Sequence, residues 1–164
     1  MQRRQWVQRA ALAAAATALP RWAWLQPTPL AANPFALGVA SGDPAPDGMV
    51  LWTRLLPSPG EPLPAQTVHW ELAHDEGFQR IVQKGQATAA PERGHSVHVE
   101  VRGLEPGRWY HYRFMLGQAT SATGRTCTAP ALHALPGRLR VAFASCQRWE
   151  HGHYAAWRHV CNDQ

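Results

Sequence analysis

Short apolar runs that alternate with polar residues fill the middle of the chain, from about residue 38 to residue 128. Residues 67–72 alternate apolar and polar side chains, and the same period of two recurs in residues 96–101 and, with aromatic residues, in 110–114. This period is the signature of strands that bury one face. Residues 49–53 form a continuous apolar run after the turn signal Asp-Gly, which predicts a more fully buried strand.

The alternation in these strands predicts which tryptophan and histidine side chains face the core and which face solvent. Trp52 and Trp70 fall on positions expected to face the core, so packing explains them better than a stacking surface for sugars or bases. His69 and His98 fall on the polar phase, and His111 lies between two tyrosines on the face opposite to theirs. We expect these three histidines to face solvent and to bind no metal.

The segment before the last of these strands has the spacing of a known corner. Leu104, Pro106 and Tyr110 stand two and four residues apart. In fibronectin type III-like sandwiches a tyrosine at this place bonds through its hydroxyl to nearby backbone and closes the turn. The pattern therefore predicts a mainly β fold, an antiparallel immunoglobulin/fibronectin III-like sandwich, over residues 33–132.

The character of the chain changes after a short linker at residues 133–137. Residues 139–145 are small and apolar without interruption from Val141 to Ala144, which predicts a strand buried on both faces of a sheet, and residues 152–160 predict a helix. Ligands of α/β sheets collect beyond the carboxyl ends of strands, where Cys146 stands. One strand and one helix cannot close a sheet, so we interpret residues 138–164 as the truncated start of an α/β domain.

The amino terminus resembles a twin-arginine (Tat) export signal. Arg3 and Arg4 precede a polar residue, an aromatic and an aliphatic one, followed by a mildly apolar stretch over residues 10–18 that is too short to span a bilayer. Cleavage could follow Ala18 or Ala32, and the later position is favoured because the resemblance described below begins at Asn33. We interpret residues 1–32 as the signal peptide and its flanking segment.

Charge and cysteine content exclude other classes of protein. The formal net charge of the 164 residues is +5, but four of the sixteen basic residues lie before Asn33, which leaves twelve against eleven acidic residues. A nucleic-acid-binding surface is therefore not expected. The three cysteines, Cys127, Cys146 and Cys161, cannot all pair within the chain, and a disulfide between Cys127 and Cys161 is conceivable but not required.

Several blocks in order resemble the alkaline phosphatase D (PhoD) family. The resemblance runs from Asn33 to His159. Its blocks are residues 33–54 with Ser41-Gly-Asp-Pro44 and Leu51-Trp-Thr-Arg54, residues 95–99, the corner at 104–110, residues 124–126, and Phe143-Ala-Ser-Cys-Gln147. The resemblance implies a fibronectin III-like PhoD N-terminal domain followed by a metallophosphoesterase domain that hydrolyses phosphate esters.

The resemblance also implies cofactors, Fe³⁺ and Ca²⁺, and a role for one residue of this chain. The family cysteine of the Ser-Cys-Gln block is a metal ligand and maps onto Cys146, whose thiolate suits iron better than calcium. The other ligands lie downstream of a Gly-Asp-Tyr block that this sequence does not reach. We therefore expect no complete catalytic site and no activity from this chain alone, and export by the Tat translocon to the periplasm or the medium.

Three alternatives remain open at the level of sequence. Cys146, His151, His153, His159 and Cys161 resemble a zinc cluster, although no Cys-x-x-Cys pair anchors it and the first two histidines would point to different faces of a helix. The chain could instead be a secreted, non-enzymatic sandwich module that binds a partner. The same family also includes phospholipase D-like phosphodiesterases, so monoester, diester and phospholipid substrates are not distinguished.

Overall fold

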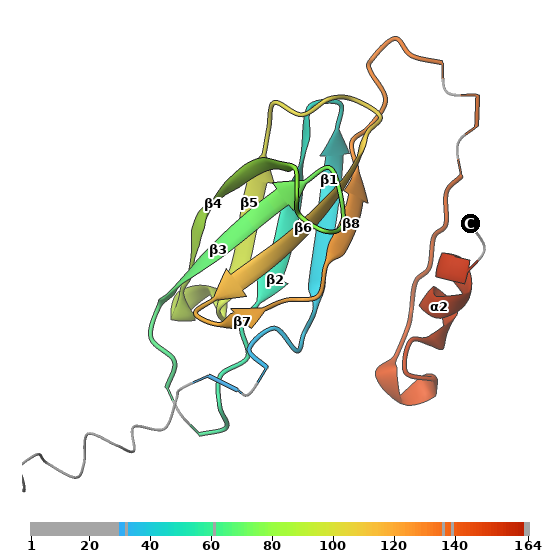
Figure 1. Ribbon diagram of the computed structural model, residues 1–164. Helices are drawn as coiled ribbons and strands as arrows, with labels where there is room; N and C mark the ends of the chain where they lie inside the picture. The colour runs from blue at the N-terminus through green and yellow to red at the C-terminus, as the bar shows by residue number, and fades with distance from the viewer. Residues whose placement is uncertain (1–29, 32, 61, 136, 139, 163–164) are drawn as a thin grey trace, which may run out of the picture. The chain divides into compact units, whose positions relative to one another are not determined.

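The computed structural model describes residues 30–31, 33–60, 62–135, 137–138 and 140–162 (Figure 1). The chain divides after Ala129 into two compact units, and each is described by itself. The first unit contains the predicted sandwich, and the second contains the residues for which the sequence predicts the start of another domain.

The first sheet of the sandwich has three antiparallel strands in the order β1-β2-β5 (Figure 1). They are β1 (Val39–Ala45), β2 (Gly48–Arg54) and β5 (Ser96–Val101). Leu51 in the central strand lies opposite Ser41 on one side and Val99 on the other. The edge strand β1 contains an irregularity between Gly42 and Ala45, which bends it where proline would interrupt regular pairing.

The second sheet contains the remaining strands in the order β4-β3-β6-β7, and β8 also pairs with β6. Their bounds are β3 (Gln66–Ala73), β4 (Ile81–Ala89), β6 (Trp109–Leu116), β7 (Ala119–Thr120) and β8 (Gly124–Cys127), with a short 3₁₀ turn η2 (Pro91–Arg93) before β5. All described pairings are antiparallel. The predicted mainly β, fibronectin III-like sandwich is therefore confirmed.

One apolar core joins the inner faces of the two sheets. Alternate residues of β2, β3, β5 and β6 enter it, as expected for strands that bury one face. The largest fully buried side chains include Tyr110, Phe114, Met49, Leu51, Leu55 and Leu72. This cluster positions every loop of the sandwich, because the strands that carry the loops are fixed by it.

Trp52 does not belong to this core, contrary to the prediction. The buried phase of β2 is Met49, Leu51 and Thr53, so Trp52 lies on the opposite face and is half-buried. Because residues 49–52 are all apolar, their sequence does not indicate which alternate residues face the core. The pairing of β2 with its neighbours determines this. Thr53 takes the inner position instead, where its hydroxyl donates to the Gly38 carbonyl at 2.9 Å.

Trp70 shares its face with Val68 and Leu72, as predicted, and packs against the core while remaining half-buried. Its register partner on β4 is Gly85. A Cβ at Gly85 would lie 2.8 Å from the indole of Trp70, so the ring covers the place where a side chain would stand. The tryptophan thus supplies the packing that the glycine lacks.

Two polar arrangements close the ends of strands. The backbone N–H of Glu105 donates to the Tyr110 hydroxyl at 3.0 Å, and the hydroxyl of Thr128 donates to the Glu105 carbonyl at 2.7 Å. After β3, the Asp75 carboxylate accepts the backbone N–H groups of Gln79 and Arg80 at 3.0 and 2.9 Å. These donors, that of Gln79 foremost, hold the pKa of Asp75 below its ordinary value.

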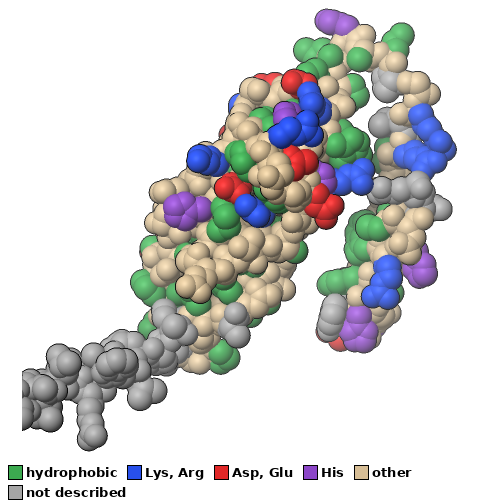
Figure 2. Space-filling model, in the orientation of Figure 1, with side chains coloured by type: hydrophobic (Ala, Val, Ile, Leu, Met, Phe, Trp, Pro, Cys, Tyr) green, Lys and Arg blue, Asp and Glu red, His purple; other side chains and the backbone are tan. Residues whose placement is uncertain are grey.

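The outer face of the second sheet is polar and carries paired charges. The Arg113 guanidinium donates to the Glu71 carboxylate at 2.7 Å and lies 4.0 Å from the centre of the Phe78 ring. Arg125 lies 3.9 Å from the centre of the Trp109 ring. In Figure 2, positive and negative side chains lie interspersed on the visible face of the sandwich.

The second unit contains the 3₁₀ turn η3 (Trp149–His151) and the helix α2 (Ala155–Asn162). The helix begins later than predicted, because Gly152, His153 and Tyr154 have positive φ angles that a right-handed helix excludes. The predicted strand at 139–145 is absent: the described residues 140–145 form no strand, and Val141 and Phe143 are 75% and 96% exposed. A strand buried on both faces needs neighbouring strands, and the described part of this unit contains none.

Candidate functional site

The candidate site is a small hollow in the second unit. Its volume is about 210 Å³, and it is lined by Cys146, Gln147, Arg148, His151, Gly152, Tyr154, Ala155 and Ala156. The lining begins at the end of the apolar segment 140–145 and ends in the first turn of α2. The hollow is therefore formed by the loop between the predicted strand and helix, the position that the sequence assigned to a site.

The backbone of this loop adopts conformations that side chains disfavour. Cys146, His153 and Tyr154 have φ angles of 55°, 51° and 57°. Such angles are uncommon outside glycine and asparagine, and they cluster at positions where surrounding structure or function imposes them. At Cys146 the turn leaves the side chain exposed, with its thiol free.

Two side chains of types that can bind metals border this hollow. His151 lines the same hollow as Cys146, so one thiol and one imidazole border a common space. Nowhere among the residues that the structure describes do three or more His, Cys, Asp or Glu side chains gather closely enough to hold a metal ion. The zinc cluster considered from the sequence is therefore not assembled, since a structural zinc site needs four ligands.

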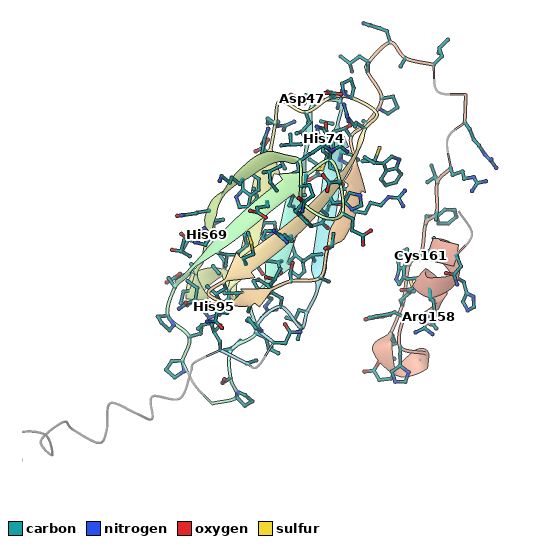
Figure 3. All side chains as sticks on the ribbon, in the orientation of Figure 1. Asp47, His69, His74, His95, Arg158 and Cys161 are labelled. Carbon is teal, nitrogen blue, oxygen red and sulfur yellow. The ribbon has the colours of Figure 1, made fainter. Side chains whose placement is uncertain are left out.

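The other cysteine and histidine candidates lie outside this hollow. His159 and Cys161 both belong to α2, and Cys161 is exposed (Figure 3). Cys127, at the end of β8 in the first unit, is a free thiol as well. Partial burial raises the pKa of the Cys127 thiol, although the nearby Arg125 opposes the shift.

The structural residues chosen from the sequence lie together at one turn of the sandwich. Leu104 and Tyr110 are buried, and Pro106 lies in the turn between them. The export-signal residues Arg3 and Arg4 lie outside the described residues. Among the described helices, none is long and apolar enough to cross a membrane.

Two features of the molecule were not anticipated. Arg148 and Tyr154 border the hollow beside Cys146, in a loop without a periodic pattern that could single them out. In the sandwich, a second, larger hollow of about 430 Å³ is lined by residues of β3, β4 and β6. Its lining residues are His69, Trp70, Glu71, Lys84, Gly85, Gln86 and Met115, and Figure 3 shows His69 at this surface. The pairing of β3 with both β4 and β6 brings them together.

Known proteins resemble this chain over most of its length. The family described as "PhoD-like phosphatase, N-terminal domain" matches residues 20–130. Alkaline phosphatase D of Bacillus subtilis (strain 168) is 51% identical over 135 residues, which are 80% of this chain and 23% of that protein. The chain thus spans only about a quarter of the length of this curated relative (23%).

A solved structure described as "Structure of PhoD" agrees with this assignment. It matches with a TM-score of 0.71 and 49% identity, over 84% of this chain and 27% of that one. An fn3 domain of the human collagen alpha-1(XX) chain matches with a TM-score of 0.40 and 20% identity, over 71% of this chain and 99% of that one. On the family match and the 51% identity together, this chain belongs to the family of PhoD-like phosphatase N-terminal domains.

Proposed function

We propose that the chain is the N-terminal part of an exported alkaline phosphatase D-like enzyme that hydrolyses phosphate esters. The identity of 51% to alkaline phosphatase D carries this proposal, because it extends over 80% of the chain. In this proposal residues 33–132 are a folded support, and residues 138–164 lead into the domain that performs the chemistry.

The contribution of this chain to the chemistry is a single ligand. Cys146 is exposed in a hollow at a loop between an apolar segment and a helix, where a thiolate could bind iron. In a complete site, iron and calcium ions would polarise phosphoryl oxygens and stabilise the developing charge. The described residues offer no group of three ligands, so they do not fit a whole site, and we assign no catalytic step to them.

Activity measurements on two lengths of chain test this proposal. The purified 164-residue protein, supplied with iron and calcium, is expected to hydrolyse p-nitrophenyl phosphate no faster than buffer containing the same ions. The gene read beyond Gln164 is expected to encode Gly-Asp-Tyr within a few dozen codons, and its longer product to be active. Metal-dependent hydrolysis by the 164-residue protein would contradict the prediction that this chain alone is inactive. An inactive longer product would contradict the proposal that the chain belongs to an enzyme.

Cys146 can be tested in the longer product. Cys146→Ser is expected to lower both bound iron and activity, because an alcohol is a poor ligand for iron compared with a thiolate. Cys161→Ser, on the following helix, is the matched control and should retain both. Equal iron content in the two variants would contradict the role of Cys146.

Export is tested by changing the paired arginines. Arg3→Lys together with Arg4→Lys is expected to keep the protein in the cytoplasm of a Tat-competent host, whereas Arg9→Lys should not. Fractionation followed by immunoblotting measures the distribution. If the doubly substituted chain is exported as well as the parent, the Tat proposal is wrong.

The substrate class is tested with the same longer product. Rates on p-nitrophenyl phosphate, bis(p-nitrophenyl) phosphate and phosphatidylcholine vesicles separate a monoesterase from a diesterase and from a phospholipase D-like enzyme.

The hollow over β3, β4 and β6 supports a second candidate function, a secreted module that binds a partner or a cell-wall component. Binding of the 164-residue chain to isolated cell walls, lost in His69→Ala and retained in His98→Ala, would favour the module.

A further inference from the structure

The first described residues of the chain are paired with the body of the sandwich. Leu30 forms an antiparallel bridge with Pro57, and the backbone N–H of Ala31 donates to the Leu56 carbonyl at 3.2 Å. The Ser58 hydroxyl donates to the Leu30 carbonyl at 2.7 Å. In Figure 1 this piece of chain enters at the end of the sandwich where residues 55–58 leave β2.

The side chain of Leu30 takes part in this attachment. It is half-buried and packs against the apolar core that joins the two sheets. Leu30 and Ala31 are therefore held by both backbone hydrogen bonds and packing. They form an integral part of the folded unit.

The residues on the other side of position 32 are held equally well. Phe35 is buried, and its backbone N–H donates to the Asn33 side-chain carbonyl at 3.1 Å. The Leu56 N–H donates to the Pro34 carbonyl at 2.9 Å. The peptide bond between residues 32 and 33 is thus flanked on both sides by backbone that the fold engages.

A processing peptidase needs free backbone on both sides of the bond that it cuts. Susceptibility to cleavage follows the burial and hydrogen bonding of the affected backbone, and paired segments must first open. Export by the Tat route presents the peptidase with a protein that has already folded. A cut after Ala32 would require Leu30 and Ala31 to leave their partners, and it would then remove them from the domain.

We propose that the export-processing cut lies on the N-terminal side of Leu30, so that the mature protein retains Leu30 and Ala31. Of the two cleavage positions considered from the sequence, the bond between Ala18 and Leu19 satisfies this condition. Its hydrolysis by water gives a carboxylate on Ala18 and a free amine on Leu19. The inference rests on the proposed export and reverses the preference for Ala32 drawn from the sequence.

The amino terminus of the exported protein tests the position directly. The full chain is produced in a Tat-competent host, recovered from the exported fraction, and examined by intact mass and N-terminal sequencing. We expect Leu19 as the first residue. A start between residues 20 and 30 would overturn the choice of Ala18 while preserving the retention of Leu30, and a start at Asn33 would overturn the proposal itself.

A second measurement does not depend on export. Two chains made in the cytoplasm, one beginning at Leu19 and the other at Asn33, are compared by thermal unfolding. The shorter chain is expected to unfold at a temperature lower by about 4 °C or more, and its Leu56 amide should exchange faster. Ser58→Ala in the longer chain removes one of the hydrogen bonds and should give an intermediate value.

The two measurements separate the possible failures. If the full chain stays uncut in the cytoplasm but the chain that begins at Asn33 is less stable, the export proposal is wrong and the structural attachment of Leu30 stands. If the two cytoplasmic chains unfold at the same temperature, Leu30 and Ala31 add nothing to the fold, and the inference is refuted whatever the outcome of the export experiment.

Discussion

The hydroxyl of Tyr110 provides the sharpest test of how the sandwich is held together. Its side chain is 1% exposed, and the oxygen accepts the backbone N–H of Glu105 at 3.0 Å. Tyr110→Phe keeps the ring, which stacks on His74 at 5.4 Å between centres, and removes only the acceptor. The Glu105 N–H is then left without this partner in a partly buried turn.

Leaving such a donor unpaired costs about 1–3 kcal/mol of folding free energy. For a domain of roughly a hundred residues, each kcal/mol lowers the unfolding temperature by about 4–8 °C. We expect Tyr110→Phe to lower the midpoint of urea unfolding without changing its slope, and to accelerate hydrogen exchange at the Glu105 amide. Circular dichroism and exchange mass spectrometry measure the two effects.

Glu105→Ala is the matched control, because it retains the backbone N–H and removes only an exposed ion pair with Arg108. Exposed pairs contribute between about 0 and 1 kcal/mol, so this variant should unfold close to the parent. The reasoning fails if Tyr110→Phe unfolds at the same urea concentration as the parent, or if Glu105→Ala costs as much as Tyr110→Phe.

Three further predictions concern packing and titration. Gly124→Ala would place a Cβ 2.2 Å from the Tyr112 ring, so its free energy of unfolding in urea should fall by about 1–3 kcal/mol. Gly42→Ala, which has open space around the added Cβ, is the control and should lose less stability. Equal losses would show that the clash is not the cause. The pKa of Asp75 is depressed in the folded state, so its contribution to stability is present above its unfolded pKa and is lost as the pH falls through the folded value. The stability difference between the parent and Asp75→Asn should therefore be constant near neutral pH and shrink below about pH 4, and a difference that persisted at pH 2 would be contrary to this account. Because burial raises the pKa of Cys127, its thiol should be alkylated at pH 8 more slowly than the two exposed cysteines, as peptide mapping after timed labelling would show; equal rates would contradict it.

The sequence predicted the strands whose two faces differ. The alternation in residues 96–101 matches β5 residue for residue, and residues 67–72 and 110–114 lie within β3 and β6. Each of these strands buries one face against the core and leaves the other less buried, and this difference between the faces produces the alternation seen in the sequence.

Two other strands, β1 and β4, were not predicted from the sequence. β1 contains Gly42, Asp43 and Pro44, residues typical of turns, and most of its side chains are exposed. β4 has Gly85 in the middle, and its side chains are exposed or only partly buried except for Ala89. Both strands lie at sheet edges, as β5 does, but unlike β5 they lack a regular series of buried apolar residues that would mark them as strands.

For the candidate site, the sequence located the loop but not its shape. Cys146 was singled out by its place after an apolar run and by the family resemblance, whereas the hollow around it depends on positive φ angles at His153 and Tyr154. The preceding segment was expected to be a strand. Its apolar side chains would need neighbouring strands or helices to pack against, and the described residues of this unit do not cover them.

The exposed apolar segment at residues 140–145 also has a practical meaning for handling the protein. Val141 and Phe143, both residues that favour strands, expose most of their surface to water in a stretch with a single charge. Such a stretch can pair with the same stretch of a second copy. We expect the solubility of the purified 164-residue chain to be limited by concentration-dependent self-association through this segment, and replacement of Phe143 by lysine to raise the concentration at which the chain remains monomeric.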